Sequence, residues 1–203
     1  MVFEKIQYDF WKQKDPQPFE YTVDYKLKQS TNIEMSYLRL GWISNFLSIP
    51  QMKSMNVVDI GCGNRCFLNC VTNSFKNVYG YDVAGESISK HDLYTLEWDL
   101  IVLSDVLEHF EDINDLFKMK WKYAFISYPE TPVTDSIEEL SKWKHFKPDE
   151  HLWCLNEEGM KAWLGNNNCN VLGISNFEDI IRSRWDETLP NITSFFIENK
   201  KPV

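Results

Sequence analysis

The residues best suited to chemistry in this sequence surround a glycine bend. A β-branched run ending in Asp59 and Ile60 leads into Gly61 and Gly63, and a helical pattern follows. Glycines at such a turn let the backbone approach a ligand closely, and the start of a helix presents unpaired N–H groups to it. A carboxylate at Asp59 repels a pyrophosphate but can bind an ammonium group. We therefore expect a zwitterionic ligand that carries an amino acid.

A second acidic residue ends the next strand-like run. Asp82 follows Gly61 by about 20 residues, where an acidic side chain can accept hydrogen bonds from both hydroxyls of a ribose. The carboxyl ends of neighbouring parallel strands meet at one edge of a sheet, so Asp59 and Asp82 should face the same pocket.

A third group follows a later strand-like run. Asp105, Glu108 and His109 have the spacing i, i+3, i+4, which predicts that they share one face of a helical turn. Their oxygens and imidazole could bind a hard divalent ion. The alternative is structural, with Glu108 buried in a hydrogen-bond network and no metal present.

The elements that must position these residues alternate along the chain. Strands are expected at Asn56 to Ile60, Val78 to Asp82, Asp99 to Ser104, Ala124 to Tyr128, Asn170 to Ile174 and Thr193 to Glu198. Helices are expected at Ile33 to Leu47 after an Asn32 cap, Arg65 to Phe75, Asp112 to Lys120 and Glu157 to Leu164. This order predicts an α/β fold with a doubly wound, mostly parallel sheet between helices.

The length of 203 residues and the lack of a Pro/Gly/Ser-rich linker favour one domain, residues 1–203. Residues 1–31 are aromatic and charged and contain Pro16 and Pro18, so we expect an irregular arm that packs on the core of residues 32–203. The alternative is a lid over the ligand.

Three motifs carry a resemblance to a known family. Val57 to Asn64 matches its first motif, Tyr79 to Asp82 its second and Asp99 to His109 its fourth. Over roughly residues 33 to 199, the chain resembles the class I S-adenosylmethionine-dependent methyltransferases, enzymes with a Rossmann-like fold. Asp149 to Leu152, before an Asn-capped helix, is similar to the branch that includes the ubiquinone-pathway O-methyltransferases.

The resemblance implies a site residue by residue. Contacts to S-adenosylmethionine are expected from Asp59, Gly61, Cys62, Gly63, Asp82, Val83, Asp92, Ser104 and Asp105. His109 and His151 are the expected catalytic residues. Similar acidic-x-x-Glu-His sets bind a metal in ubiquinone-pathway and small-RNA 2′-O-methyltransferases, which implies Mg²⁺ or another divalent ion on Asp105, Glu108, His109 and His151. His145 is an alternative later ligand, and His151 could instead anchor the following helix.

The sequence departs from the family pattern at two places. Arg65 stands where the family has a third glycine, so the loop must turn without that freedom or pack differently. The segment Val83 to Trp98 is too short for a full crossover helix, strand and return loop, so the third β-α unit should be shortened. Arg39 could reach the carboxylate of the cofactor, although a surface ion pair is the favoured interpretation.

Composition bounds the partners and the compartment. The formal charge is −9, from 21 Lys+Arg against 30 Asp+Glu, which disfavours duplex DNA. Five cysteines, no leader-like opening and no long apolar run favour a reduced, cytoplasmic environment without a membrane.

We expect methyl transfer to an oxygen or nitrogen of a small molecule. One alternative is a metal-dependent RNA 2′-O-methyltransferase, which would use a local strip of Lys118, Lys120, Lys122, Lys142, Lys144 and Lys147. The other is a scaffold that binds the cofactor without catalysis, as Arg65 and the shortened third unit suggest.

Overall fold

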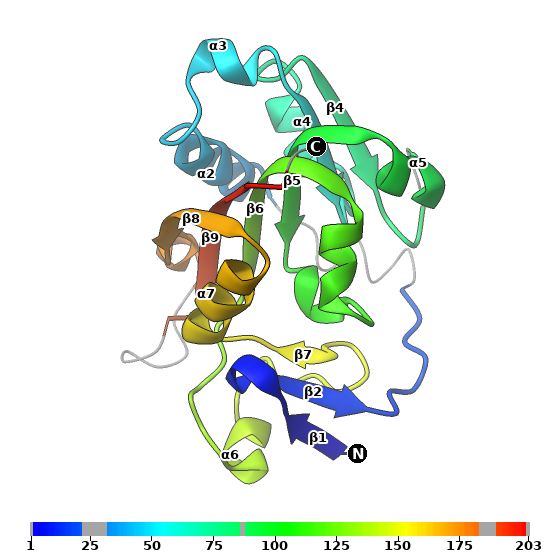
Figure 1. The fold of residues 1–203 in the computed structure, drawn as a ribbon, viewed down its shortest axis with the longest axis vertical. Helices are drawn as coiled ribbons and strands as arrows, with labels where there is room; N and C mark the ends of the chain where they lie inside the picture. Colours follow the sequence, from blue (N-terminus) through cyan, green and yellow to red (C-terminus); the bar gives the residue numbers. More distant parts are fainter. Residues whose placement is uncertain (1, 22–31, 86–87, 183–189, 202–203) are drawn as a thin grey trace.

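The centre of the molecule is a sheet with both faces covered (Figure 1). The computed structural model describes residues 2–21, 32–85, 88–182 and 190–201, and in these ranges six strands pair in the order β4-β3-β5-β6-β9-β8. Their bounds are β3 Asn56–Ile60, β4 Asn77–Tyr81, β5 Glu97–Ser104, β6 Lys120–Pro129, β8 Cys169–Ser175 and β9 Ile192–Asn199. Only β9 runs against its neighbours among these strands. The predicted Rossmann-like, mostly parallel sheet is confirmed.

The strand order places a switch point at β3. The chain passes from β3 to β4 on one side and then returns to β5 on the other, and Asp59 lies in register with Gly80 and with Val102. Ligands of doubly wound sheets bind where the order reverses, at the carboxyl ends of the strands. The sheet therefore directs the ends of β3, β4 and β5 to one place.

The third β-α unit is shortened, as predicted. Between β4 and β5 the described residues form one six-residue helix, α5 (Lys90–Thr95), and no strand. No described segment therefore pairs with the free edge of β4. α5 begins with Ser89, which accepts a hydrogen bond from the Asp92 N–H. The sheet consequently ends at β4.

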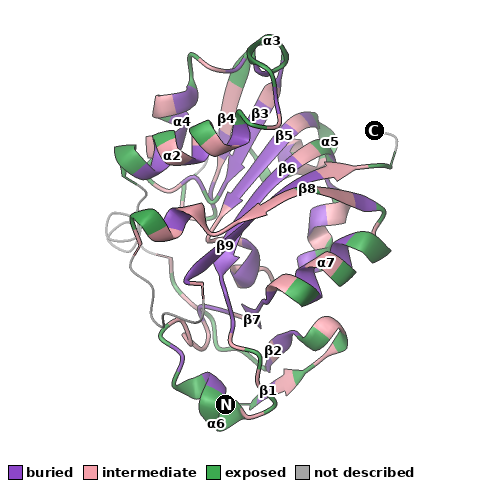
Figure 2. Cartoon of the chain, turned by 90° about the vertical axis from the view of Figure 1, so that its left-hand side faces the viewer, coloured by how far each residue is buried: buried purple, intermediate pink, exposed green. Residues whose placement is uncertain are grey.

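Helices cover the two faces of the sheet and form two hydrophobic cores (Figure 2). One face packs against α2 (Ile33–Ile43), α3 (Ile49–Met52), α4 (Cys66–Val71) and the 3₁₀ helix η4 (Phe177–Ile180). The other packs against α5, η3 (Ile113–Lys118) and α7 (Glu157–Asn166). No helix within the described ranges is long and apolar enough to cross a membrane.

Three predicted helices are shorter in the structure, among them the helix predicted from Arg65 to Phe75, which is α4 and ends at Val71. α2 ends at Ile43 rather than Leu47, because the side chains of Ser44 and Asn45 donate hydrogen bonds to the carbonyls of the last turn. The helix predicted from Asp112 to Lys120 is the shorter η3, since Lys120 already pairs with Glu97 in the sheet.

The N-terminal segment is not the irregular arm that its composition predicted. β1 (Val2–Lys5) and β2 (Trp11–Lys14) form a hairpin through η1 (Gln7–Asp9), and β2 pairs with β7 (Trp153–Cys154) (Figure 1). α6 (Ile137–Ser141) packs on this small sheet through Leu140. The prolines that suggested irregularity follow β2, so they interrupt no pairing. Residues 22–31 of the predicted arm lie outside the described residues.

Candidate active site

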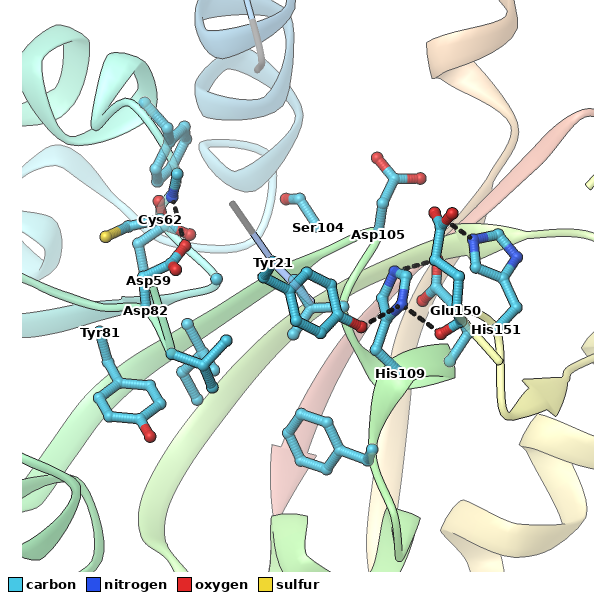
Figure 3. A pocket seen from close by; sticks show the side chains of 18 of the residues that line it. Tyr21, Asp59, Cys62, Tyr81, Asp82, Ser104, Asp105, His109, Glu150 and His151 are labelled. Atoms are coloured by element: carbon cyan, nitrogen blue, oxygen red, sulfur yellow. Dashed lines mark hydrogen bonds and ion pairs between the residues drawn. The ribbon is translucent and has the colours of Figure 1, made fainter. Parts of the chain in front are cut away.

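A cavity of about 790 Å³ lies at the carboxyl ends of β3, β4 and β5. Asp59 and Asp82 line one part of it, called here the aspartate half, and His109, Glu150 and His151 line the other, called here the histidine half (Figure 3). The ring of Tyr21, from the N-terminal segment, lies between the two halves. The volume is in the range of sites for small molecules and cofactors.

The glycine bend closes the aspartate half. Gly61 has a φ of +71°, and a Cβ at this position would lie 2.3 Å from Cγ2 of Val106. The Gly61 N–H donates to the Tyr81 carbonyl at 2.7 Å, and the Gly63 N–H donates to Oδ2 of Asp82 at 2.9 Å. These bonds hold the ends of β3 and β4 together. Because of the positive φ and the close contact with Val106, only glycine fits at residue 61.

Arg65 makes the turn that the family assigns to glycine. Its φ is +64°, in the left-handed region, and α4 begins at the next residue. For a residue with a Cβ this conformation costs about 1 to 2 kcal/mol. The loop therefore keeps a turn suited to glycine, in spite of the substitution.

Asp59 and Asp82 are both buried at the strand ends. Burial raises the pKa of Asp59 to about 7, an effect that Arg39 opposes and Asp82 reinforces. The Asp82 carboxylate accepts hydrogen bonds from the N–H groups of Gly63 and Ala84, each at 2.9 Å. The structure thus brings both predicted carboxylates to one cavity, with Asp82 fixed by main-chain donors.

Most other residues expected to contact the cofactor line the same cavity: Gly61, Cys62, Gly63, Val83, Ser104 and Asp105. Asp92 does not line it, because its carboxylate accepts hydrogen bonds from Ser89 at the start of α5. Leu93 and Tyr94 of the same helix line the cavity instead. Helical spacing alone could not decide which residue of α5 points inward.

Arg39 forms a buried ion pair rather than the predicted surface pair. Its side chain is 1% exposed, and its guanidinium donates to both carboxylate oxygens of Glu178, at 2.7 and 2.9 Å. η4 covers this face of α2, which the sequence of α2 does not reveal. Arg39 still lines the cavity, and no local sequence pattern marks Glu178 as its partner.

Asp105 belongs to this ion network. Arg182 donates to its two carboxylate oxygens at 2.9 and 2.5 Å. Although burial alone would raise the pKa of Asp105, the pairing with Arg182 holds it well below its usual range. Arg182 lies far along the chain, and sequence reasoning missed it.

His109 has a defined tautomer. Its Nδ1 lies 2.7 Å from the Glu150 carbonyl oxygen, which can only accept, so Nδ1 carries the proton. Its Nε2 then has the lone pair, and the Tyr21 hydroxyl oxygen lies 3.1 Å from Nδ1. Burial lowers the pKa of His109, so the ring is neutral near pH 7.

Glu108 and His151 complete the histidine half. Glu108 is 2% exposed, and neither of its carboxylate oxygens has a hydrogen-bond partner among the described residues. Burial raises the pKa of Glu108 well above its usual range and lowers the pKa of His151 to about 2. Ligand atoms of Glu108, His109 and His151 lie within 4.8 Å of one another.

Asp105 does not join this cluster, contrary to the expected helical face. The backbone takes a φ of +54° at Asp105, and the following turn is the three-residue 3₁₀ helix η2 (Leu107–His109). The left-handed residue directs the Asp105 carboxylate toward Arg182 instead. His145, the alternative later ligand, has its Nε2 2.7 Å from Oδ1 of Asn191.

Comparison with known proteins agrees with this fold. The chain belongs to the family described as methyltransferase domain, whose profile matches residues 35–174. No curated protein matches the sequence. This family makes the chain a methyltransferase, and its fold is the one found in S-adenosylmethionine-dependent methyltransferases of known structure.

Several solved structures are similar. An S-adenosylmethionine-dependent methyltransferase from Clostridium acetobutylicum is 13% identical with a TM-score of 0.56, over 85% of this chain and 94% of its own. Magnesium protoporphyrin IX methyltransferase from Synechocystis, with bound SAH, is 14% identical with a TM-score of 0.56, over 83% of each chain. A plantazolicin methyltransferase in complex with an analogue and SAH is 13% identical with a TM-score of 0.54, over 88% and 90%. At these identities the likeness concerns the fold.

Proposed function

We propose that this enzyme transfers the methyl group of S-adenosylmethionine to a hydroxyl oxygen of a small molecule. The observation that carries the proposal is the neutral His109 in the histidine half, with Nδ1–H held by the Glu150 carbonyl and a lone pair on Nε2. An oxygen nucleophile must lose its proton, and a neutral imidazole nitrogen with a lone pair can accept it. For an amine acceptor, we would instead expect an ionised carboxylate at this position, which would bind the ammonium form of the amine.

The aspartate half fits the cofactor. Asp82 would hold the ribose hydroxyls and Asp59 the ammonium group, and the bend at Gly61 admits a ligand close to the backbone. When bound, S-adenosylmethionine supplies a methyl carbon made electrophilic by its sulfonium. The chain would orient acceptor and methyl group, exclude water from the cavity and accept the acceptor proton on Nε2 of His109. His151 would contact the acceptor.

The experiment measures cofactor binding and methyl transfer separately. Calorimetry with S-adenosylmethionine tests the aspartate half, and release of the demethylated cofactor with a panel of phenols, catechols, hydroxy acids and amines tests the acceptor. We expect His109→Gln to lower turnover by about 10²- to 10⁴-fold, the usual loss of a general base, with unchanged cofactor affinity. His91→Gln is the matched control, because His91 is an exposed residue of α5. Equal turnover in His109→Gln and wild type would refute the role of His109.

A divalent metal is the alternative to a base in the histidine half, because an ion bound to His109 would take the same Nε2 lone pair. Glu108, His109 and His151 would hold it, and the unpartnered oxygens of buried Glu108 favour it. Two imidazoles and one carboxylate suit Zn²⁺ or Mn²⁺ better than Mg²⁺, and such an ion would lower the pKa of a bound hydroxyl. Equilibrium dialysis with zinc, manganese and magnesium salts measures this, with Glu108→Gln expected to abolish binding. Activity that survives a chelator would exclude a required metal.

The RNA alternative loses its supporting surface. Lys118, Lys120 and Lys122 lie at the start of β6, whereas the other three predicted lysines follow α6, beyond the opposite end of β6 (Figure 1). Lys118, Lys142 and Lys147 each form an ion pair with an acidic residue. We therefore propose neither an RNA nor a duplex DNA substrate. Kinship with the ubiquinone-pathway branch stays a prediction, and binding without turnover in the panel would favour the scaffold alternative.

We also propose that residues 1–203 fold as one unit in the cytoplasm. The pairing of β2 with β7 supports the first part, because it joins the N-terminal hairpin to a segment of the core. The five cysteines are all free thiols, which supports a reducing compartment.

A further inference from the structure

The histidine half depends on a loop with little regular structure. The segment from residue 142 to 152 joins α6 to β7 and contributes His145, Lys147, Glu150 and His151 to the cavity. Loops position catalytic groups well only when other elements fix them. The fixed partner of this loop is the N-terminal hairpin.

Gln13 of β2 and Asp149 of the loop form a reciprocal pair. Nε2 of Gln13 donates to Oδ1 of Asp149 at 2.5 Å, and the Asp149 N–H donates to Oε1 of Gln13 at 2.7 Å. The Gln17 N–H donates to the same Oδ1 at 2.9 Å, and the Gln13 N–H donates to the Leu152 carbonyl at 2.9 Å. Gln13 is 3% exposed, so its side of the pair is buried, while Asp149 is half-buried and the bond from Gln17 is exposed.

The pair fixes a strained residue next to a functional carbonyl. Asp149 has a φ of +68°, in the left-handed region that residues with a Cβ adopt only where their surroundings hold them. The next residue is Glu150, whose carbonyl oxygen accepts a hydrogen bond from the Nδ1–H of His109. The orientation of that carbonyl therefore depends on the backbone that Gln13 holds.

We propose that Gln13 is a positioning residue that, through Asp149 and the Glu150 carbonyl, fixes His109 in the Nδ1–H tautomer. Which nitrogen of a histidine carries the proton is set by the hydrogen bond that the other atom makes. Without the hydrogen bond to the Glu150 carbonyl, the proton would move to Nε2 of His109. Nε2 could then no longer accept a proton from the acceptor. The catalytic role of this tautomer rests on the proposed function. The tautomer itself can be measured in the free enzyme, without a methyl acceptor.

The experiment reads the tautomer directly. Imidazole nitrogen NMR of ¹⁵N-labelled protein at about pH 8, above the ordinary pKa of histidine, distinguishes the two neutral forms. The chain has 4 histidines, so assignment by single His→Gln variants is practicable. We expect Gln13→Ala to lower the ratio of the Nδ1–H to the Nε2–H form of His109 by about fivefold, the scale for one hydrogen bond. Gln7→Ala is the matched control, because Gln7 is an exposed residue of the same hairpin.

A swap of the two partners gives the decisive test. Gln13→Glu alone places two carboxylates together and should shift the tautomer. In the double variant with Asp149→Asn, the new amide would donate to Glu at residue 13, and asparagine tolerates the left-handed backbone. We expect this variant to regain the wild-type tautomer.

The outcomes separate this inference from the proposed function. An unchanged His109 tautomer in Gln13→Ala would overturn the inference, as would equal tautomer ratios in Gln13→Glu and the double variant, which decides the matter if Gln13→Ala does not fold. Calorimetry with S-adenosylmethionine should give the same affinity in all variants, because Gln13 does not line the cavity. A wild-type enzyme without methyl transfer but with the expected tautomers would refute the proposed function alone.

Discussion

The two halves of the cavity are built in different ways. The aspartate half comes mainly from two short segments, residues 59 to 64 and 81 to 83, each a strand end and its turn. The histidine half needs residues from segments far apart in the sequence, such as His109 and His151. The first half is determined by backbone geometry, and the second by side chains that tertiary packing brings together.

This difference separates the expected effects of substitution. A change in the aspartate half should alter cofactor affinity and leave the state of His109 unchanged. A change in the histidine half, or in Gln13, should do the reverse. Each prediction below tests whether the halves are independent in this sense.

The largest effect is expected from Gly61→Ala. The added Cβ would lie 2.3 Å from Cγ2 of Val106 in a backbone with a φ of +71°. Strain of this kind together with the displaced β-branched side chain amounts to about 3 kcal/mol, so we expect roughly a 100-fold loss of S-adenosylmethionine affinity by calorimetry. Gly63→Ala is the matched control, since Gly63 has a φ of +50° and its nearest contact is at 4.0 Å. If Gly61→Ala and Gly63→Ala lost the same affinity for S-adenosylmethionine, the positive φ would explain the loss and the contact with Val106 would not.

Asp82→Ala and Asp59→Ala should come next. Each would remove the proposed charge-assisted hydrogen bond to the cofactor, so affinity should fall by one to a few kcal/mol, about 10- to 100-fold. Asp82→Ala also deprives the Gly63 and Ala84 N–H groups of their acceptor, which makes it the larger loss. Unchanged dissociation constants would contradict the assignment of the aspartate half.

The strand ends and the sheet could be predicted because they depend on local signals. The β-branched run Asn56 to Ile60 is the observed β3, and the glycine bend follows it directly. Arg182, Glu178 and Gln13 could not be predicted, because their partners lie far away in sequence and no local pattern marks them. Asp92 illustrates the same limit, since a local hydrogen bond to Ser89 competes with the cavity.

The pH dependence of cofactor binding should follow Asp59. The pKa of Asp59 is raised to about 7, chiefly by burial, and the ammonium group of the cofactor favours the ionised carboxylate. Affinity should therefore be constant above pH 7 and fall below it, by up to about tenfold for each pH unit. Calorimetry between about pH 5.5 and 8.5 measures this. Asp59→Asn should flatten the profile, and a wild-type profile without a step near neutrality would argue against Asp59 as the ammonium ligand.

The smallest effect is expected at Arg65, and it concerns stability. Arg65 has a φ of +64° and an exposed side chain, so Arg65→Gly removes backbone strain without removing a buried contact. Because glycine also loses more entropy on folding, we expect a net gain of about 0.5 to 1 kcal/mol in the free energy of unfolding by urea.

Asn64→Gly is the matched control for Arg65→Gly. Asn64 is an exposed neighbour whose φ does not lie in the left-handed region, and its Oδ1 accepts a hydrogen bond from the Cys66 N–H at 3.0 Å. Glycine there should therefore cost entropy and this hydrogen bond, and lower the free energy of unfolding. Cofactor affinity should stay within about twofold in Arg65→Gly, because the loop already has the turn that glycine would allow. A loss of stability in Arg65→Gly would mean that the arginine side chain stabilises the loop by more than its backbone conformation costs. The aspartate half would then depend on a side-chain contact as well as on backbone geometry, as the histidine half does.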